Sequence, residues 1–441
     1  MSQADLSKDL YKLWKLLSSS SLPNWDSFPA QEAMLKDARA LFRAEEAKDL
    51  QFLVASKIED IQHFDVANME RAVAICMCGR SGSELLASYL DRHDDVIMLP
   101  NLQSQLIYQF FERHPSLSLH DKLITYPVVA DFFQGDFAIA AADYYSAVNA
   151  LFEVYGNCSL EFLESRRTFF LFLHIVYCVA LGRRPASPRP LIVYAQHLRH
   201  DQLARRFIED FPQARFIHTV RDPITSCGRW FDFSKLFAGD ANSGSALYAA
   251  ERVIRQAINS DMPHRGMESR TRTIRFEDLH LQLEKTMRAV ADWLGLPYRS
   301  SLLDSTFNGV PWVVKRGTIS WSGPRPEQAI RDARNISFTD QGLLFAVFNE
   351  DFMAWNYPCP NIFKHALVRI LTCLLVLLIP MKIEIIAARR LIKKLPPLRC
   401  GGIRYAINGL VRIVICRVAI MSLLAVDLCR RLAFGKKVLK L

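Results

Sequence analysis

The spacing of hydrophobic positions changes near residue 71 and divides the chain into parts of different character. Downstream of this point, short apolar runs alternate with amphipathic stretches, and the runs read RAVAICM, DVIMLP, LIVYAQH, ARFIHTV and RTIRF. Short apolar runs between helices predict an α/β fold whose parallel sheet is covered on both faces. Upstream, apolar residues recur at helical intervals, as at Leu6, Leu10, Leu13 and Leu17. This spacing predicts a helical N-terminal extension over residues 1–70.

Two other segments differ from the alternating region. Residues 103–183 are rich in Phe, Tyr and Leu and predict a helical insertion. The last part of the chain is apolar and basic, so we expect a main α/β domain at 71–360 and a separate tail of helices at 361–441.

The tail combines apolar runs with basic residues. Ile370 to Met381 carries no charge, whereas Leu410 to Leu428 is interrupted by Arg412, Arg417 and Asp427. Neither segment offers the clean run of about 20 apolar residues that a membrane-spanning helix needs. A pair of core helices is one interpretation, and a helix pair lying in a membrane interface is the other.

The net charge of +10 is concentrated in this tail. From Lys364 onward the chain holds 16 Lys and Arg against Glu384 and Asp427, a net charge of +14, so the remainder carries −4. Each basic residue near an anionic membrane adds about 1 kcal/mol of attraction. We therefore expect the tail to bind an anionic membrane surface. Nucleic acid is not the expected partner, because few polar and aromatic residues interleave with these charges.

The cysteines and the N-terminus indicate a compartment. Ten cysteines are scattered along 441 residues without paired CxxC motifs, so neither a zinc site nor a disulfide scaffold is expected. The first 20 residues lack the basic start and apolar core of a signal peptide. These features predict a cytoplasmic protein that is peripheral or monotopic on the inner face of the membrane.

The run VAICMCGRSGSELLASYLDRH reads as a strand, a glycine-rich turn and a helix. The turn holds Gly79, Arg80, Ser81, Gly82 and Ser83, which supply close backbone approach, a guanidinium and two hydroxyl groups. A helix N-terminus with such a turn binds phosphate, although the same pattern can be a plain strand–helix connection. The turn lacks the Gly-Lys-Ser/Thr of nucleotide triphosphatases, so ATP or GTP hydrolysis is disfavoured. The fold class predicted is thus a P-loop-like three-layer α/β/α arrangement with a central parallel sheet.

Two more motifs follow predicted strands. Arg221-Asp222-Pro223 ends a strand at the edge of the sheet where ligands bind in open α/β folds, and Arg221 could grip a second phosphate. Glu277-Asp278-Leu279 follows another strand and precedes a helix closing on Leu-Gly-Leu-Pro. Each has a plain structural interpretation, because Arg221 could pair with Asp222 and the acidic pair could cap a helix.

Together, in order and spacing, the three motifs resemble those of the sulfotransferase family, which uses 3′-phosphoadenosine 5′-phosphosulfate. The resemblance covers about residues 71–358, and the closing FMAWNYP looks like the end of bacterial members. It implies a sulfotransferase catalytic domain at 71–360 that needs no metal. By the resemblance, Arg80 steadies the leaving phosphate, Ser81, Gly82 and Ser83 hold the 5′-phosphate, and Arg221 takes the 3′-phosphate.

The chain departs from the family pattern at two places. The family often has Ser eight residues after the Arg of Arg-Asp-Pro, where this chain has Arg229, with Ser226 three residues earlier. Either residue could serve the 3′-phosphate, and we favour Arg229 for its charge. The family favours Thr at the position of Glu84.

Two residues are candidates for the general base that accepts the acceptor's proton. His197 ends LIVYAQH, and Ala-Gln-His-Leu resembles the Lys-Thr-His-Leu of cytosolic members, with Ala195 in place of the Lys. Glu84 is the rival base, although a Glu near a helix N-terminus commonly serves the helix dipole.

These features predict a membrane-associated sulfotransferase that sulfates a hydroxyl of a carbohydrate or glycolipid acceptor. The membrane preference of the tail is the sequence feature that points to a lipid-linked acceptor. Two alternatives are a P-loop kinase and a catalytically inactive membrane-bound scaffold with the same fold.

Overall fold

A computed structural model describes residues 31–46, 51–77, 81–100, 106–197, 201–229, 267–316, 319–333, 336–378, 385 and 440–441. The chain divides into two compact units. The larger unit comprises Phe28–Thr219, Pro263–Ala329 and Leu439–Leu441, and the smaller comprises Met1–Ser27, Val220–Met262 and Ile330–Val438. Residues 1–30 of the expected N-terminal extension and residues 410–428 of the expected tail lie outside the described residues.

The larger unit is built on a five-stranded sheet with the order β2-β3-β1-β4-β5. The neighbouring pairs β1–β3, β1–β4 and β2–β3 are parallel. The strands are β1 (Ala72–Met77), β2 (Val96–Met98), β3 (Leu191–His197), β4 (Arg215–Val220) and β5 (Thr271–Arg275). The strands predicted from the five apolar runs are therefore present, and the expected central parallel sheet is confirmed.

Both faces of the sheet are buried, which explains why its strands are continuous apolar runs. Successive side chains of a strand point to opposite faces. In β1, Ala74 and Cys76 belong to one hydrophobic core and Val73 and Ile75 to the other. The fold therefore has the three α/β/α layers that the sequence predicts, and Cys76 is a small core residue.

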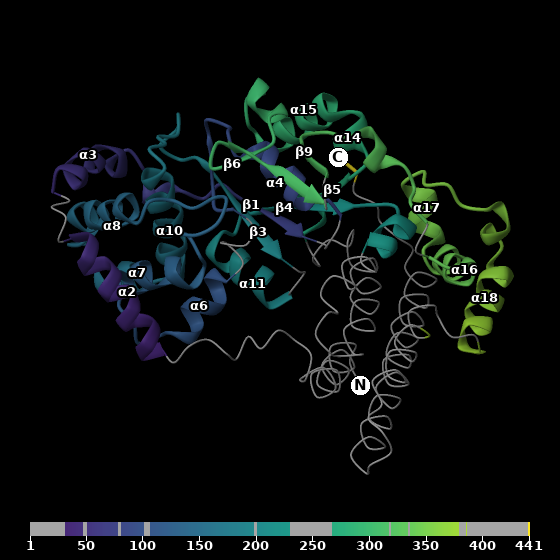
Figure 1. Ribbon diagram of the computed structural model, residues 1–441, viewed down its shortest axis with the longest axis horizontal. Helices are drawn as coiled ribbons and strands as arrows, with labels where there is room; N and C mark the ends of the chain where they lie inside the picture. Colours follow the sequence, from purple (N-terminus) through teal and green to yellow (C-terminus); the bar gives the residue numbers. More distant parts are fainter. Residues whose placement is uncertain are drawn as a thin grey trace, which may run out of the picture. The chain divides into compact units, whose positions relative to one another are not determined.

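The first face is covered by helices from the N-terminal part and the insertion. Figure 1 shows α2, α3, α6, α7, α8 and α10 grouped beside the strands. Aromatic side chains fill the core beneath them, among them Tyr108, Phe170 and Tyr194. These helices are α2 (Gln31–Glu46), α3 (Gln51–Gln62), α6 (Ile107–Arg113), α7 (Leu119–Val129), α8 (Ala141–Tyr155), α9 (Leu160–Glu164), α10 (Arg166–Ala180) and α11 (Asp201–Asp210). The predicted helical insertion is thus present.

The second face is covered by α4 (Ser83–Leu90), α14 (Asp278–Leu281) and α15 (Leu283–Leu294). Gly295 ends α15 in the left-handed conformation, with φ of 68°, as expected for a glycine after the last helical turn. Short elements complete this unit: η1 (Val66–Asn68), η2 (Glu268–Arg270), η3 (Ser300–Leu303), η4 (Pro326–Ala329), β6 (Thr306–Phe307), β7 (Val310–Pro311), β8 (Val313–Arg316) and β9 (Ile319–Ser322).

The described part of the smaller unit is helical. Residues 223–229 form a helix after β4. The other elements are α16 (Phe338–Val347), α17 (Asn349–Ala354), η5 (Asn361–Lys364) and α18 (Ala366–Leu378). Phe345 of α16 packs against Phe352 of α17 and Phe363 of η5, with ring centroids 5.1 and 5.5 Å apart. Within the described residues, no helix is both long and apolar enough to cross a membrane.

Candidate functional site

The loop after β1 opens α4 at the carboxyl end of the central strand. Ser81 and Gly82 lead directly into Ser83, the first residue of α4. Gly79 and Arg80, which the sequence also places in this loop, lie outside the described residues. Strands β3 and β4 flank β1, so the strand order reverses here. Ligands of open α/β sheets bind at such a point.

The first turn of α4 begins with backbone N–H groups that have no acceptor within the helix. The first intrahelical hydrogen bond runs from Leu86 N to Gly82 O at 3.0 Å, so the N–H groups of Ser83, Glu84 and Leu85 lack acceptors within the helix. Glu84 is exposed, whereas the other seven residues of α4 are buried. The carboxylate of Glu84 therefore lies on the outer side of the first turn.

Gly82 is required by the geometry of this loop. Its φ is +89°, a left-handed conformation that L side chains rarely adopt. A Cβ atom at Gly82 would lie 2.1 Å from Cδ2 of Phe276. Phe276 directly precedes the Glu-Asp-Leu motif and packs edge-on against His280, with ring centroids 4.4 Å apart. The first and third sequence motifs therefore meet at the contact between Gly82 and Phe276.

Ser81 forms a hydrogen bond with strand β4. Its Oγ lies 2.6 Å from Oγ1 of Thr219 in β4, and both side chains are buried. Sequence reasoning missed Thr219, because a single Thr in an apolar strand carries no signal of a polar contact 138 positions away.

His197 ends β3 next to this loop. The β1–β3 register pairs His197 with Met77, the residue directly before the 78–80 segment. The structure thus brings the backbone of this candidate base to the same edge of the sheet as Ser81 and Gly82. The side chain of His197 lies outside the described residues.

Tyr194 lies three residues before His197 in β3. Burial raises the pKa of the Tyr194 phenol well above its ordinary value, so this group stays protonated and does not act as a base.

In the smaller unit, Arg-Asp-Pro starts a helix. Asp222 accepts hydrogen bonds from the backbone N and the Oγ1 of Thr225, at 2.9 and 3.2 Å. Pro223 occupies the first helical position, where its missing N–H costs nothing. Asp222 is therefore the N-cap residue of helix 223–229. Arg221 lies between the last residue of β4 and this cap, and its side chain is half-buried.

Arg331 forms an ion pair with the carboxylate of Asp222. Its Nε donates to Asp222 Oδ2 at 2.9 Å, and its Nη2 contacts the same oxygen. The guanidinium lies over the rings of Phe345 and Phe352, 5.6 and 5.4 Å from their centroids. Nothing in the pattern of residues around Arg331 predicts this contact, because 109 positions separate it from Asp222.

Ser226 and Arg229 lie three residues apart on helix 223–229 and therefore on one side of it. Arg229 Nη2 is 3.4 Å from Asp332 Oδ2, so a carboxylate already faces this guanidinium. Asp332 N also donates to Thr225 Oγ1 at 3.0 Å. Burial raises the pKa of the Cys227 thiol on the same helix, as do Asp222 and Asp340. That thiol therefore stays protonated and is not a nucleophile.

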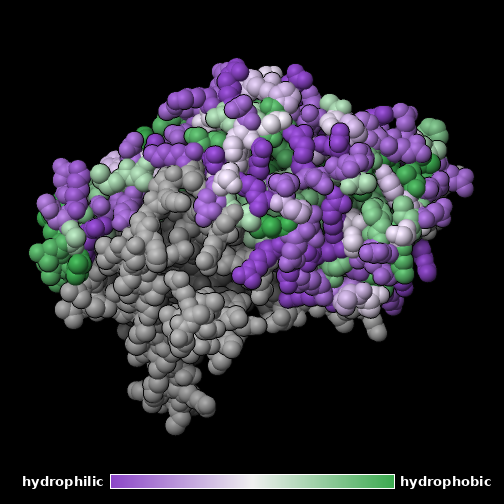
Figure 2. Space-filling view, turned by 180° about the vertical axis from the view of Figure 1, so that it is seen from behind, coloured by the Kyte–Doolittle hydropathy of each residue, from purple (hydrophilic) through white to green (hydrophobic). Residues whose placement is uncertain are grey.

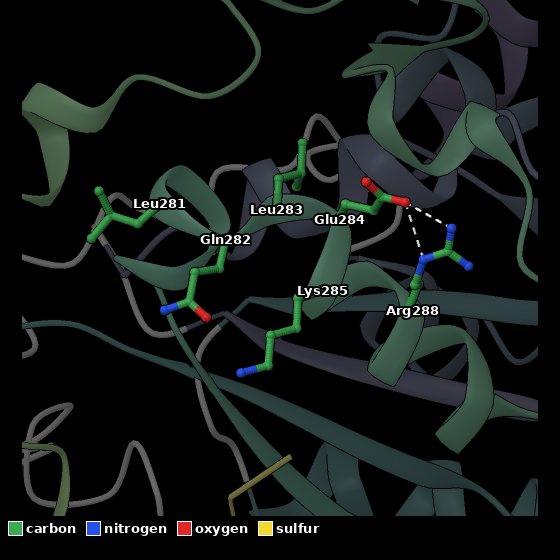
Figure 3. Close-up of a pocket in the computed structure, with 6 residues that line it drawn as sticks. All are labelled: Leu281, Gln282, Leu283, Glu284, Lys285 and Arg288. Carbon is green, nitrogen blue, oxygen red and sulfur yellow. Dashed lines mark hydrogen bonds and ion pairs between the residues drawn. The ribbon is translucent and has the colours of Figure 1, made fainter.

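A shallow pocket of about 600 Å³ lies elsewhere in the larger unit, at the turn between α14 and α15. Figure 3 shows Glu284 and Arg288 paired at one end of it, with bonds of 3.1 and 2.7 Å from the guanidinium. None of the site residues predicted from the sequence lines this pocket, which is formed by Leu281, Gln282, Leu283, Glu284, Lys285 and Arg288. We therefore centre the candidate site on the loop before α4.

The described geometry of the loop before α4 suits an anion. Backbone N–H groups at the start of a helix, buried hydroxyl groups and a glycine with positive φ are features that suit a phosphate group. Among the described residues, no group of three or more His, Cys, Asp or Glu is arranged to hold a metal ion. Arg221 belongs to the smaller unit, whereas Ser81, Gly82 and Ser83 belong to the larger unit.

Comparisons with known proteins give one family and nine similar chains of solved structures, three of which are described below. Residues 72–300, slightly more than half of the chain, match the family model described as sulfotransferase family. A search of curated proteins finds no significant match.

Three of the similar structures are sulfotransferases or sulfotransferase domains. A sulfotransferase domain from the curacin biosynthetic pathway is 19% identical and covers 66% of this chain and 98% of its own, with a TM-score of 0.36. A domain from the olefin synthase of Synechococcus PCC 7002 is 18% identical over 53% and 76%, with a TM-score of 0.28. A sulfotransferase from Mycobacterium avium is 12% identical over 80% and 97%, with a TM-score of 0.35. Because these TM-scores are low, the family rests on the family model.

Proposed function

Because this chain belongs to the sulfotransferase family, whose members generally use 3′-phosphoadenosine 5′-phosphosulfate as sulfate donor, we propose that it sulfates a hydroxyl of a carbohydrate or glycolipid acceptor with that donor. The observation that carries the proposal is the loop before α4. It combines the N–H groups at the start of a helix with two buried serines and a glycine in a left-handed conformation that other residues rarely adopt. Such a loop suits the 5′-phosphosulfate of the donor.

Each candidate residue then has a distinct role. Ser81 and Ser83 bind the 5′-phosphosulfate with Gly82, and Arg80 neutralises charge on the leaving phosphate. Arg221 binds the 3′-phosphate through bidentate hydrogen bonds, and Ser226 or Arg229 contributes a further contact. In the transfer, the bond from sulfur to the phosphate oxygen breaks as the acceptor oxygen bonds to sulfur. The acceptor proton passes to a base, and 3′,5′-bisphosphoadenosine leaves.

His197 is the base we favour. His197 pairs with Met77 at the carboxyl edge of the sheet. This position supports the role, because the proposed phosphosulfate loop follows Met77 in the sequence. Glu84 is less suited, because an acidic residue exposed on the first turn of a helix already interacts favourably with the helix dipole. Because the Glu84 side chain is exposed, its carboxylate does not lie among the N–H groups that would bind the anion.

Calorimetry with 3′,5′-bisphosphoadenosine tests the donor site directly. We expect the wild-type protein to bind it, and Arg221→Ala to weaken binding about 30-fold or more, because a charged hydrogen bond to phosphate contributes about 2 kcal/mol. Arg113→Ala, a change outside the proposed site, is the control. No binding by the wild type would refute the donor assignment, and unchanged affinity in Arg221→Ala would remove Arg221 from the site.

The base is tested in the same preparation. His197→Ala should keep its affinity for 3′,5′-bisphosphoadenosine but lose transfer of labelled sulfate to a glycolipid fraction. Glu84→Gln should retain most transfer. The reverse pattern would assign the base to Glu84, and transfer retained in both variants would exclude both residues as the base. Absence of transfer by the wild type would favour an inactive scaffold.

We propose further that the tail attaches the protein to an anionic membrane at the cytoplasmic face. Supporting this, α18 exposes Leu367, Leu371 and Leu375, which are 67%, 49% and 55% exposed and follow one another along one side of the helix. Thr372 lies about 100° around the helix from this row, and its Cγ2 would be 4.0 Å from a Cβ added at Gly342 of α16. Figure 2 shows the resulting hydrophobic area at its left edge, over α18.

The charges near α18 agree with this partner. Lys364 is exposed just before the helix, and Arg369 lies within it. The sequence holds no acidic residue between Asp351 and Glu384. An apolar helix face accompanied by basic residues favours the interface of an anionic bilayer.

A further inference from the structure

Two buried hydroxyl groups join the loop before α4 to β4. Ser81 Oγ lies 2.6 Å from Thr219 Oγ1, and the two residues are 4% and 0% exposed. A single hydrogen lies between two hydroxyl oxygens in such a contact, so one group donates and the other accepts. Which of the two donates decides where the second hydrogen points.

The surroundings of Thr219 set this direction. Among the described residues, Ser81 is the hydrogen-bond partner that the structure gives to the Thr219 hydroxyl. If Ser81 donated, the hydrogen of Thr219 would be buried without an acceptor and would carry the full cost of lost hydration. Donation from Thr219 to Ser81 avoids that cost.

We infer that Thr219 is a positioning residue of the donor site. It donates to Ser81 Oγ and so directs the Ser81 hydrogen away from β4, toward the loop that would hold the 5′-phosphosulfate. Consecutive hydrogen bonds polarise one another, so the Ser81 hydroxyl also becomes a stronger donor. This inference rests on the proposed function, because it assigns Ser81 to the bound phosphosulfate.

The place of Thr219 in the chain gives the contact a second consequence. Thr219 lies in β4 two residues before Arg221, while Ser81 follows β1, the neighbouring strand. The hydroxyl pair therefore fixes the loop for the 5′-phosphosulfate to the same strand that leads to the residue proposed for the 3′-phosphate.

Replacement of Thr219 by Val removes the hydroxyl and preserves the branched shape. We expect Thr219→Val to weaken the binding of 3′,5′-bisphosphoadenosine, measured by calorimetry, by about fivefold. Thr273→Val is the matched control. Thr273 is a buried Thr in β5, next to β4, and its hydroxyl has no hydrogen-bond partner among the described residues. The control should leave the affinity unchanged.

A double-mutant cycle separates positioning through Ser81 from a general effect on the fold. Ser81→Ala should weaken binding by about tenfold or more. If Thr219 acts through Ser81, adding Thr219→Val to Ser81→Ala weakens binding no further. Two independent losses that multiply would overturn the inference, as would wild-type affinity in Thr219→Val.

A second pair of variants covers the case in which Thr219→Val does not fold. Thr219→Ser and Thr219→Ala differ at this position by the hydroxyl alone, so Ser should restore the binding that Ala loses. Equal affinities of the two would also refute the role of Thr219. If the wild type itself fails to bind 3′,5′-bisphosphoadenosine, the proposed function falls. Binding by the wild type with no effect at Thr219 overturns this inference alone.

Discussion

At the residue scale, Gly82 shows how closely the loop before α4 is specified. Two independent constraints act on it, a φ of +89° and the ring of Phe276 where a Cβ would lie. The sequence indicated glycines for close approach of the backbone to an anion. The contact with Phe276 adds a packing reason that spacing along the chain could not reveal, because Phe276 belongs to another motif.

Gly82→Ala is therefore expected to lower the free energy of unfolding by about 2–4 kcal/mol, combining left-handed strain with a steric clash. Gly135→Ala is the matched control, because Gly135 has a φ of +85° and nothing within 4 Å of an added Cβ. The control should lose only about 1 kcal/mol. Urea denaturation measures both, and equal losses would show that the contact with Phe276 is unimportant.

At the element scale, the segment 330–333 contacts helix 223–229 and its N-cap through hydrogen bonds and ion pairs. Arg331 binds the N-cap residue Asp222, and Asp332 contacts both Thr225 and Arg229. Sequence patterns predicted the strand before Arg221 but not the helix start at Asp222 and Pro223. They could not predict the contacts made by residues 330–333, because these residues have neither helical nor strand periodicity.

Arg331→Ala should lower stability by about 2 kcal/mol, because it leaves the carboxylate of buried Asp222 without its guanidinium. Arg299→Ala removes an exposed pair with Asp94, whose side chains are 56% and 61% exposed, and should change stability little. The urea midpoints of both variants check this. A midpoint for Arg331→Ala as close to wild type as that of Arg299→Ala would contradict it.

At the scale of the whole molecule, the uneven distribution of charge and apolar surface bears on where the protein resides. The proposed membrane contact combines the exposed leucines of α18 with a C-terminal region of net charge +14 from residue 364 onward. Hydrophobic burial and lipid electrostatics would then act together, and either one alone gives weaker attachment.

Flotation with vesicles containing phosphatidylserine tests this attachment. Leu367→Gln with Leu371→Gln should reduce binding to the vesicles at least about tenfold, because two leucines lose their burial in the interface. Leu160→Gln with Leu281→Gln, at leucines that are 68% and 56% exposed in the larger unit, is the matched control. Equal flotation of the two double variants, or vesicle binding that high salt does not weaken, would refute the proposal.

The sequence by itself determined the parallel α/β sheet, the helical insertion and the sulfotransferase family, because these follow from spacing within short segments and from local motifs. The tertiary structure alone decided which distant residues meet. It pairs Ser81 with Thr219, Gly82 with Phe276 and Asp222 with Arg331. The physical reason is that periodicity reports which face a residue occupies, whereas side-chain contacts between distant segments depend on how the strands and helices pack.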